Sequence, residues 1–221
     1  MQEIAKSSLT QKYYQEFPLK DYFGFDILPF TSLVRFDSDE KIFKEGFEAT
    51  YLYYLIKGKA KLFLSHENGR TSLINFIDAP CFIGEMELIG AQDKASGVTA
   101  ITPCTCFRID INRCKEKLLN DAKFLRYLCL FLSKKAIGNT YNYSLNQSYC
   151  LDIRLANFIL LTEKNGYYRE KHTEVAEYLG VTYRHLLYVL AEFVKKGILE
   201  KSEKGYFIAD KNALKQIATK K

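Results

Sequence analysis

The chain of 221 residues contains no tryptophan and only three histidines, His66, His172 and His185. Cupin-type metalloenzymes need several histidines and a carboxylate that converge inside a β-barrel. His66 lies in an expected hairpin and the other two lie near the C-terminus, so they cannot build such a site. No serine elbow, P-loop or Cys–His motif is present. We therefore expect no enzyme, and we assign no catalytic residue and no metal ligand.

Long apolar runs are also missing. Residues 1–17 lack the apolar core of a signal peptide. The longest apolar-rich segment, FLRYLCLFL, is shorter than the ~20 residues of a membrane span and contains Arg126. We expect a cytoplasmic protein with no membrane partner. Its six cysteines are then expected to be reduced thiols (Cys81, Cys104, Cys106, Cys114, Cys129 and Cys150).

Proline is scarce, and none of the four prolines follows Pro103, so the second half can form long helices. The run from Lys41 to Ile109 instead consists of short β-branched and aromatic segments separated by glycines, with Asn68-Gly69 as a hairpin signal. This pattern predicts an α+β fold in three parts. These are a β jelly roll over 1–111, linking helices over 112–148, and a C-terminal domain over 149–221.

Two apolar rows share the expected long helix. The first row steps by four and three residues, as a helix–helix seam does (Leu118, Ala122, Leu125, Cys129, Leu132 and Ala136). The second row contains Phe124, Leu128 and Phe131. We expect the second row to pack on its own domain and the first to pair with a second copy. A single wide stripe on a monomer is the alternative.

The segment TEVAEYLGVTYRHLLYVLAEF, Thr173 to Phe193, predicts two short helices joined by a tight turn. Ala176 allows the helices to cross closely, and Gly180 permits the turn. Inward positions are Val175, Leu179, Val181, Leu186, Val189 and Leu190. Thr182 is placed to cap the second helix, which we expect over 182–195. Tyr183, Arg184, His185 and Tyr188 then face outwards, where a recognition helix meets base edges.

A β-wing is predicted after Lys196-Gly197, with its turn near Glu203-Lys204. Thr173, Thr182, Lys201 and Lys204 complete the set of expected DNA contacts. Residues 149–221 carry 13 Lys and Arg against nine Asp and Glu, a net charge of +4, which favours a polyanionic partner. We therefore expect 149–221 to be a winged helix-turn-helix DNA-binding domain. The alternative, from a different functional class, is a winged helix that binds another protein.

The chain resembles the cyclic-AMP receptor and fumarate-nitrate reduction regulator (CRP/FNR) family along nearly its whole length. The resemblance is carried by IFKEGFEATYLYYLIKGKAKLF, CFIGEMELIG and HTEVAEYLGVTYRHLLYVLAEFVKKGIL, and YRHLLYVL is most similar to the YeiL-like subgroup. It implies a homodimeric transcription regulator on a near-palindromic DNA site, with RNA polymerase as a further candidate partner. Half-sites would lie one DNA turn apart, ~34 Å.

The expected effector pocket departs from the family pattern. Gly84-Glu85 matches the family's ribose-binding element, but Lys94-Ala95 stands where cyclic-nucleotide binders carry Arg-Ser or Arg-Thr. Lysine offers a point charge instead of a bidentate fork. We therefore expect no cyclic nucleotide, and we expect Glu85 to make a local backbone bond. A roll that responds to no small molecule is equally compatible with these residues.

The cysteines supply alternative signals. The closely spaced N-terminal cysteines that hold an iron–sulfur cluster in oxygen-sensing relatives are absent, since the first cysteine is Cys81. Cys104 and Cys106 share one face of a strand and could act with Cys114 or Cys81 as ligands. Cys129 would approach its twin across the helix seam and could form a redox-sensitive disulfide. We expect neither a cluster nor another metal as cofactor.

Overall fold

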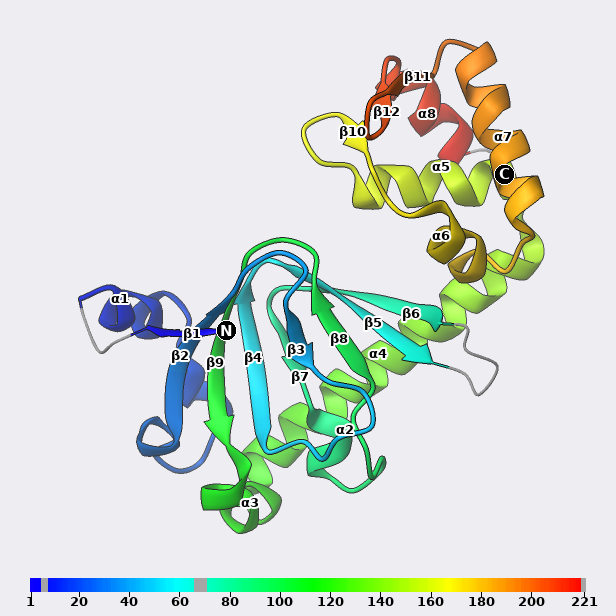
Figure 1. Cartoon of the computed structure of the whole chain (residues 1–221). Coiled ribbons are helices and arrows are strands. Elements are labelled where there is room, and N and C mark those ends of the chain that lie inside the picture. The colour runs from blue at the N-terminus through cyan, green and yellow to red at the C-terminus, as the bar shows by residue number, and fades with distance from the viewer. Residues whose placement is uncertain (5–7, 66–70, 220–221) are drawn as a thin grey trace. The chain divides into compact units, whose positions relative to one another are not determined.

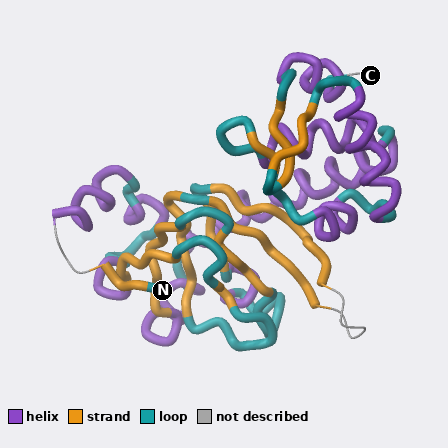
Figure 2. The backbone as a smooth tube through the Cα atoms, turned by 45° about the horizontal axis from the view of Figure 1, so that its top comes forward, coloured by secondary structure: helices purple, strands orange, loops and turns teal. Residues whose placement is uncertain are grey.

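A computed structural model describes residues 1–4, 8–65 and 71–219. The chain forms two compact units, Met1–Lys135 and Ala136–Lys221. Strands dominate the first unit and helices the second (Figures 1 and 2). The predicted α+β fold with a β roll, a long helix and a winged helix-turn-helix is confirmed. Within the described ranges, no helix is long and apolar enough to cross a membrane.

The roll consists of two antiparallel sheets. The five-stranded sheet has the order β1 (Gln2–Ile4), β2 (Thr31–Phe36), β9 (Cys104–Asp110), β4 (Tyr51–Lys57) and β7 (Cys81–Ile83). The four-stranded sheet has the order β3 (Lys41–Phe43), β8 (Gly97–Ala100), β5 (Lys59–Ser65) and β6 (Thr71–Asp78). Strands β5 and β6 pair up to Ser65 and Thr71. The predicted Asn68-Gly69 turn and His66 lie outside the described residues.

Strand β4 has an almost continuous apolar sequence, YLYYLIK, because both of its faces are buried. Alternate side chains of a strand point to opposite faces of the sheet. Leu52 and Tyr54 enter a core cluster that also contains helical residues. Tyr53 and Leu55 enter a second cluster, which the four-stranded sheet shares. Both faces of the five-stranded sheet are therefore buried, and polar positions are few.

Helical elements cover one face of the roll. They are α1 (Ser8–Glu16), the 3-10 helices η1 (Leu19–Tyr22) and η2 (Leu28–Phe30), α2 (Glu85–Leu88), α3 (Ile111–Leu119) and α4 (Ala122–Ser148). Phe124 and Leu128 of α4 are buried in this core, and Phe124 stacks on Phe23 with ring centroids 4.9 Å apart. The second apolar row thus packs on its own domain, as predicted.

The inclusion of Leu118 in the dimer seam is wrong. Leu118 belongs to α3 and is fully buried in the core of the roll. The chain turns between α3 and α4 because the Asp121 carboxylate accepts the backbone N–H groups of Lys123 and Gly24, at 3.0 and 2.7 Å. The heptad spacing therefore runs across a helix break. On α4, Ala122, Cys129 and Ala136 are exposed, and Leu125 and Leu132 are half-buried.

The second unit contains α5 (Leu151–Thr162), β10 (Tyr167–Tyr168), α6 (His172–Tyr178), α7 (Tyr183–Lys195), β11 (Leu199–Ser202), β12 (Gly205–Ile208) and α8 (Lys211–Ala218). Its sheet has the order β10-β12-β11. The inward positions predicted for α6 and α7 are buried, namely Val175, Leu179, Leu186, Val189 and Leu190. Val181 is only half-buried, because it lies in the turn itself.

Candidate nucleic-acid interface and roll cavity

The turn between α6 and α7 is held by backbone geometry and one arginine. Gly180 has φ +63°, a left-handed conformation that other residues rarely adopt. The Val181 N–H donates to the Ala176 carbonyl at 2.9 Å. Arg154 of α5 donates from Nη1 to the Leu179 carbonyl at 2.6 Å. This set fixes the direction in which α7 leaves the turn.

Thr182 caps α7 as the sequence predicts. Its Oγ1 accepts the backbone N–H of His185 at 3.2 Å, which satisfies one of the free donors at the helix start. The cap places Tyr183 and Tyr188 on the outer side of α7, where 49% and 64% of their surfaces are exposed. The first two turns of α7 thus present phenol, guanidinium and imidazole groups to solvent.

Every residue predicted to contact DNA is exposed (Thr173, Thr182, Tyr183, Arg184, His185, Tyr188, Lys201 and Lys204). They come from the first turn of α6, the start of α7 and the β11–β12 hairpin. Ser202 pairs with Gly205, so Glu203 and Lys204 form a two-residue turn at the tip of the wing. This turn leaves Lys201 and Lys204 free of the core and able to reach phosphate groups.

An aromatic cluster, absent from the sequence prediction, connects these elements. Tyr168 of β10, His172 of α6 and Tyr206 of β12 have ring centroids 5.7–6.3 Å apart. Burial lowers the pKa of His172. The pKa of Tyr206 is raised, mainly by burial and also by the nearby Tyr183 phenol. Tyr206 is therefore a further candidate DNA contact. The sequence does not reveal it, because only the pairing of β10 with β12, in which Tyr168 lies opposite Tyr206, brings it next to His172.

The roll contains a small cavity of about 60 Å³ beside α2. Gly84 and Glu85 line it, whereas Lys94 is exposed and Ala95 is buried without lining it. The expected local backbone bond of Glu85 is wrong, because its carboxylate pairs with the Lys135 ammonium of α4 at 2.7 Å. Sequence reasoning missed this pair because its two residues lie 50 positions apart.

The cysteines lie in different environments. Cys104 and Cys106 are fully buried in the core between the two sheets, on one face of β9 as predicted. Cys114 lies in the other cluster, where its thiol donates to the Asp110 carbonyl. Burial raises the pKa of Cys81 to about 12 and of Cys114 to about 11. In the described ranges, no three His, Cys, Asp or Glu side chains lie close enough together to bind a metal.

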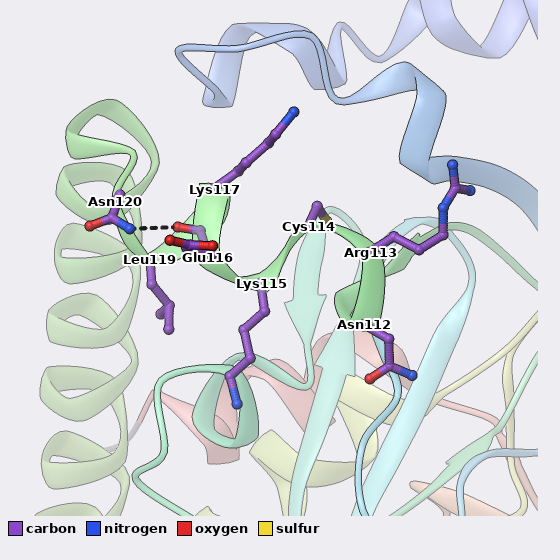
Figure 3. Close-up of a pocket in the computed structure, with 8 residues that line it drawn as sticks. All are labelled: Asn112, Arg113, Cys114, Lys115, Glu116, Lys117, Leu119 and Asn120. Atoms are coloured by element: carbon purple, nitrogen blue, oxygen red, sulfur yellow. Dashed lines mark hydrogen bonds between the residues drawn. The ribbon is translucent and has the colours of Figure 1, made fainter.

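A larger hollow of about 540 Å³ borders α3 (Figure 3). Its lining comes from α3 and the residue after it, and includes Arg113, Lys115 and Lys117. Figure 3 shows these side chains pointing outwards in different directions. Arg113 and Lys117 lie against the Phe30 ring, 5.4 and 5.1 Å from its centroid. The polar side chains that line this hollow do not converge on one point, as those of a small-molecule site do.

Comparison with known families supports both halves of this description. Residues 33–121 match the cyclic nucleotide-binding domain model, and residues 153–217 match the Crp-like helix-turn-helix domain model. The chain is also 46% identical over 203 residues to the regulatory protein YeiL of Escherichia coli O157:H7. That alignment covers 92% of this chain and 93% of that protein. The chain belongs to the CRP/FNR family. It is a DNA-binding transcription regulator of the YeiL-like subgroup.

More distant family members share the fold. A CRP-like cAMP-activated global transcriptional regulator of Mycobacterium tuberculosis H37Rv is 23% identical over 193 residues, 82% of this chain and 85% of that protein. A crp/fnr-family regulator structure from Eubacterium rectale has a TM-score of 0.75 at 16% identity, covering 88% of this chain and 92% of that one. A CRP/FNR-family structure from Thermus thermophilus has a TM-score of 0.70 at 20% identity, covering 85% and 98%.

The cyclic nucleotide implied by the first domain model does not fit the residues present. Ligand sites of small molecules and cofactors have volumes of about 300–1,000 Å³, far above the 60 Å³ of the roll cavity. The charged side chains among its described lining residues are Glu85, Glu87 and Lys135. Two carboxylates and one ammonium leave no excess positive charge for a phosphate, and Lys94 is not part of the described lining.

Proposed function

We propose that the chain acts as a homodimer that inserts α7 into the major groove of a near-palindromic DNA site. The observation that carries this proposal is the joint exposure of all eight predicted contact residues on α6, α7 and the wing. Arg184 is the main base-reading residue, because a guanidinium can bind guanine O6 and N7 together. Tyr183 and Tyr188 contact phosphate or thymine methyl groups, and Lys201 and Lys204 contact phosphate.

The exposed side of α4 supports the homodimer. Cys129, Leu130 and Ile137 are exposed there, and the apolar side chains Leu130 and Ile137 are 57% and 70% accessible. Apolar side chains on a helix surface favour association with a second helix. A second copy bound through α4 would provide two α7 helices for two half-sites. As a transcription regulator, the protein would act in the cytoplasm. It would have no catalytic role.

Selection from random duplex DNA by the purified full chain tests this function. The wild type should enrich a palindrome both under oxygen and anaerobically with reductant. Arg184→Ala should bind DNA with little sequence preference while it folds normally. Its matched control, Arg35→Ala, replaces an exposed arginine of β2 and should retain the preference. Affinity should fall steeply with rising salt, since phosphate contacts release counterions. Weak salt dependence would instead indicate a protein-binding module.

A further inference from the structure

The Glu85 carboxylate is buried, and an ammonium from a distant part of the chain neutralises it. The Glu85 side chain is 3% exposed and that of Lys135 is 31% exposed, with 2.7 Å between Oε1 and Nζ. Glu85 is the first residue of α2, directly after Gly84, whose φ is +96°. The ion pair therefore joins the short helix beside the roll cavity to the long helix α4.

The surroundings of the pair leave little room for a small-molecule partner. Gly84 is covered by the Phe43 ring, which would lie 2.9 Å from a Cβ at that position. Gln92 Nε2 donates to the Lys94 carbonyl at 2.5 Å and to Ser96 Oγ at 3.1 Å, which closes the loop after α2. The remaining 60 Å³ holds a few waters at most.

The charge balance of the cavity excludes an anionic effector. Glu87 also lines the cavity, and burial raises the pKa of its carboxyl, with Glu85 as a further cause and Lys135 acting in the opposite direction. Lys135 thus faces two carboxyl groups. A cyclic phosphate placed there would meet these groups and would have to displace the cation that neutralises Glu85.

We propose that Lys135 takes the place of a small-molecule effector, so that its bond to Glu85 couples the roll to α4 permanently and the roll binds no cyclic nucleotide. Since α4 continues from the roll into the second unit, the ion pair sets the state of the helix that leads to the reading elements. The DNA consequence of this proposal rests on the proposed function. The ion pair and the absence of nucleotide binding do not.

A thermal double-mutant cycle on the full chain tests the pair. Lys135→Met leaves a buried carboxylate without a counter-charge and should lower the Tm of the first unit by about 5–15 °C. Glu85→Gln should have a smaller effect, because Lys135 can turn towards solvent. The double variant should recover much of the loss. The control Lys115→Met, an exposed lysine of α3 away from the proposed dimer surface, should leave the Tm unchanged. A Lys135→Met variant as stable as this control would overturn the proposal.

Binding measurements separate the pair's coupling role from a purely structural one. Calorimetry with about 1 mM cyclic AMP or cyclic GMP, a concentration that would reveal even weak binding, should detect none to the wild type. Neither nucleotide should change the affinity of the wild type for DNA by as much as twofold. Lys135→Met should weaken DNA binding at least tenfold at a temperature where the variant is folded.

Nucleotide binding, or a folded Lys135→Met variant with wild-type DNA affinity, would refute the inference while the proposed function stands. If the wild type selects no DNA with or without nucleotide, the proposed function fails. The calorimetry and the thermal cycle then still decide the inference.

Discussion

The Arg154 guanidinium of α5 donates from Nη1 to the backbone carbonyl of Leu179, 2.6 Å away, at the end of α6. Replacement by methionine keeps the aliphatic stem but removes this donor from a buried helix end. We expect Arg154→Met to lower the free energy of unfolding by about 1.5–3 kcal/mol, the range for hydrogen bonds to charged groups. Urea denaturation of the second unit without DNA measures this, and Arg184→Met, which replaces an exposed arginine of the same unit, is the control. Equal effects of both changes would show that the bond adds no stability.

Thr182 caps α7 and is also a predicted DNA contact, and the two roles can be separated by substitution. Removal of the cap by Thr182→Ala should lower stability by about 1 kcal/mol. Thr182→Ser retains an oxygen that can accept the His185 N–H and should stay near wild-type stability. Chemical denaturation without DNA compares the two variants directly. If serine and alanine destabilise equally, the hydroxyl does not act as the cap.

His172 should make stability depend on pH. Burial lowers its folded-state pKa below the ordinary value of 6.5, so the unfolded chain takes up a proton at a higher pH than the folded chain. Stability therefore falls as pH decreases through 6.5. His172→Phe retains a ring beside Tyr168 and Tyr206 but takes up no proton. Its stability relative to the wild type should improve steadily from about pH 7.5 to about pH 5, the range in which an ordinary histidine changes charge.

Unfolding curves across this pH range test the idea, with the neighbouring Thr173→Ala as a control that keeps the imidazole and the wild-type profile. A difference between wild type and His172→Phe that stays constant with pH would contradict it.

Five of the six thiols should differ in their reaction with iodoacetamide at about pH 8, close to the ordinary thiol pKa. Cys150 is exposed and should react at any protein concentration. Cys104, Cys106 and Cys114 are buried, and burial raises the pKa of Cys106 and Cys114, so they should react only after denaturation. Cys129 is exposed in the single chain. If α4 pairs two copies, its labelling should slow as concentration rises while that of Cys150 does not.

Mass spectrometry of the labelled peptides provides the rates. Equal, concentration-independent labelling of Cys129 and Cys150 would count against a seam on α4.

Local patterns were sufficient for much of this molecule. Gly180, Thr182 and the spacing of Val175, Leu179, Leu186 and Val189 specify the helix-turn-helix, because a cap, a left-handed turn and a helical period each depend on residues a few positions apart. The alternating strands of the roll follow from the same kind of local rule. The exposure of the eight predicted contact residues could therefore be foreseen from the sequence.

Contacts between distant residues required the tertiary structure. Asp121 ends the heptad row because its carboxylate meets Gly24, 97 positions away, and Leu118 consequently joins the core. Lys135 reaches Glu85 across 50 positions, and Tyr206 reaches His172 through strand pairing. A periodic pattern describes one element at a time, whereas these partners are brought together only when separate elements pack. The sequence motifs thus indicate the family, and local spacing predicts the recognition helix. Only packing shows which charged side chains line the roll cavity.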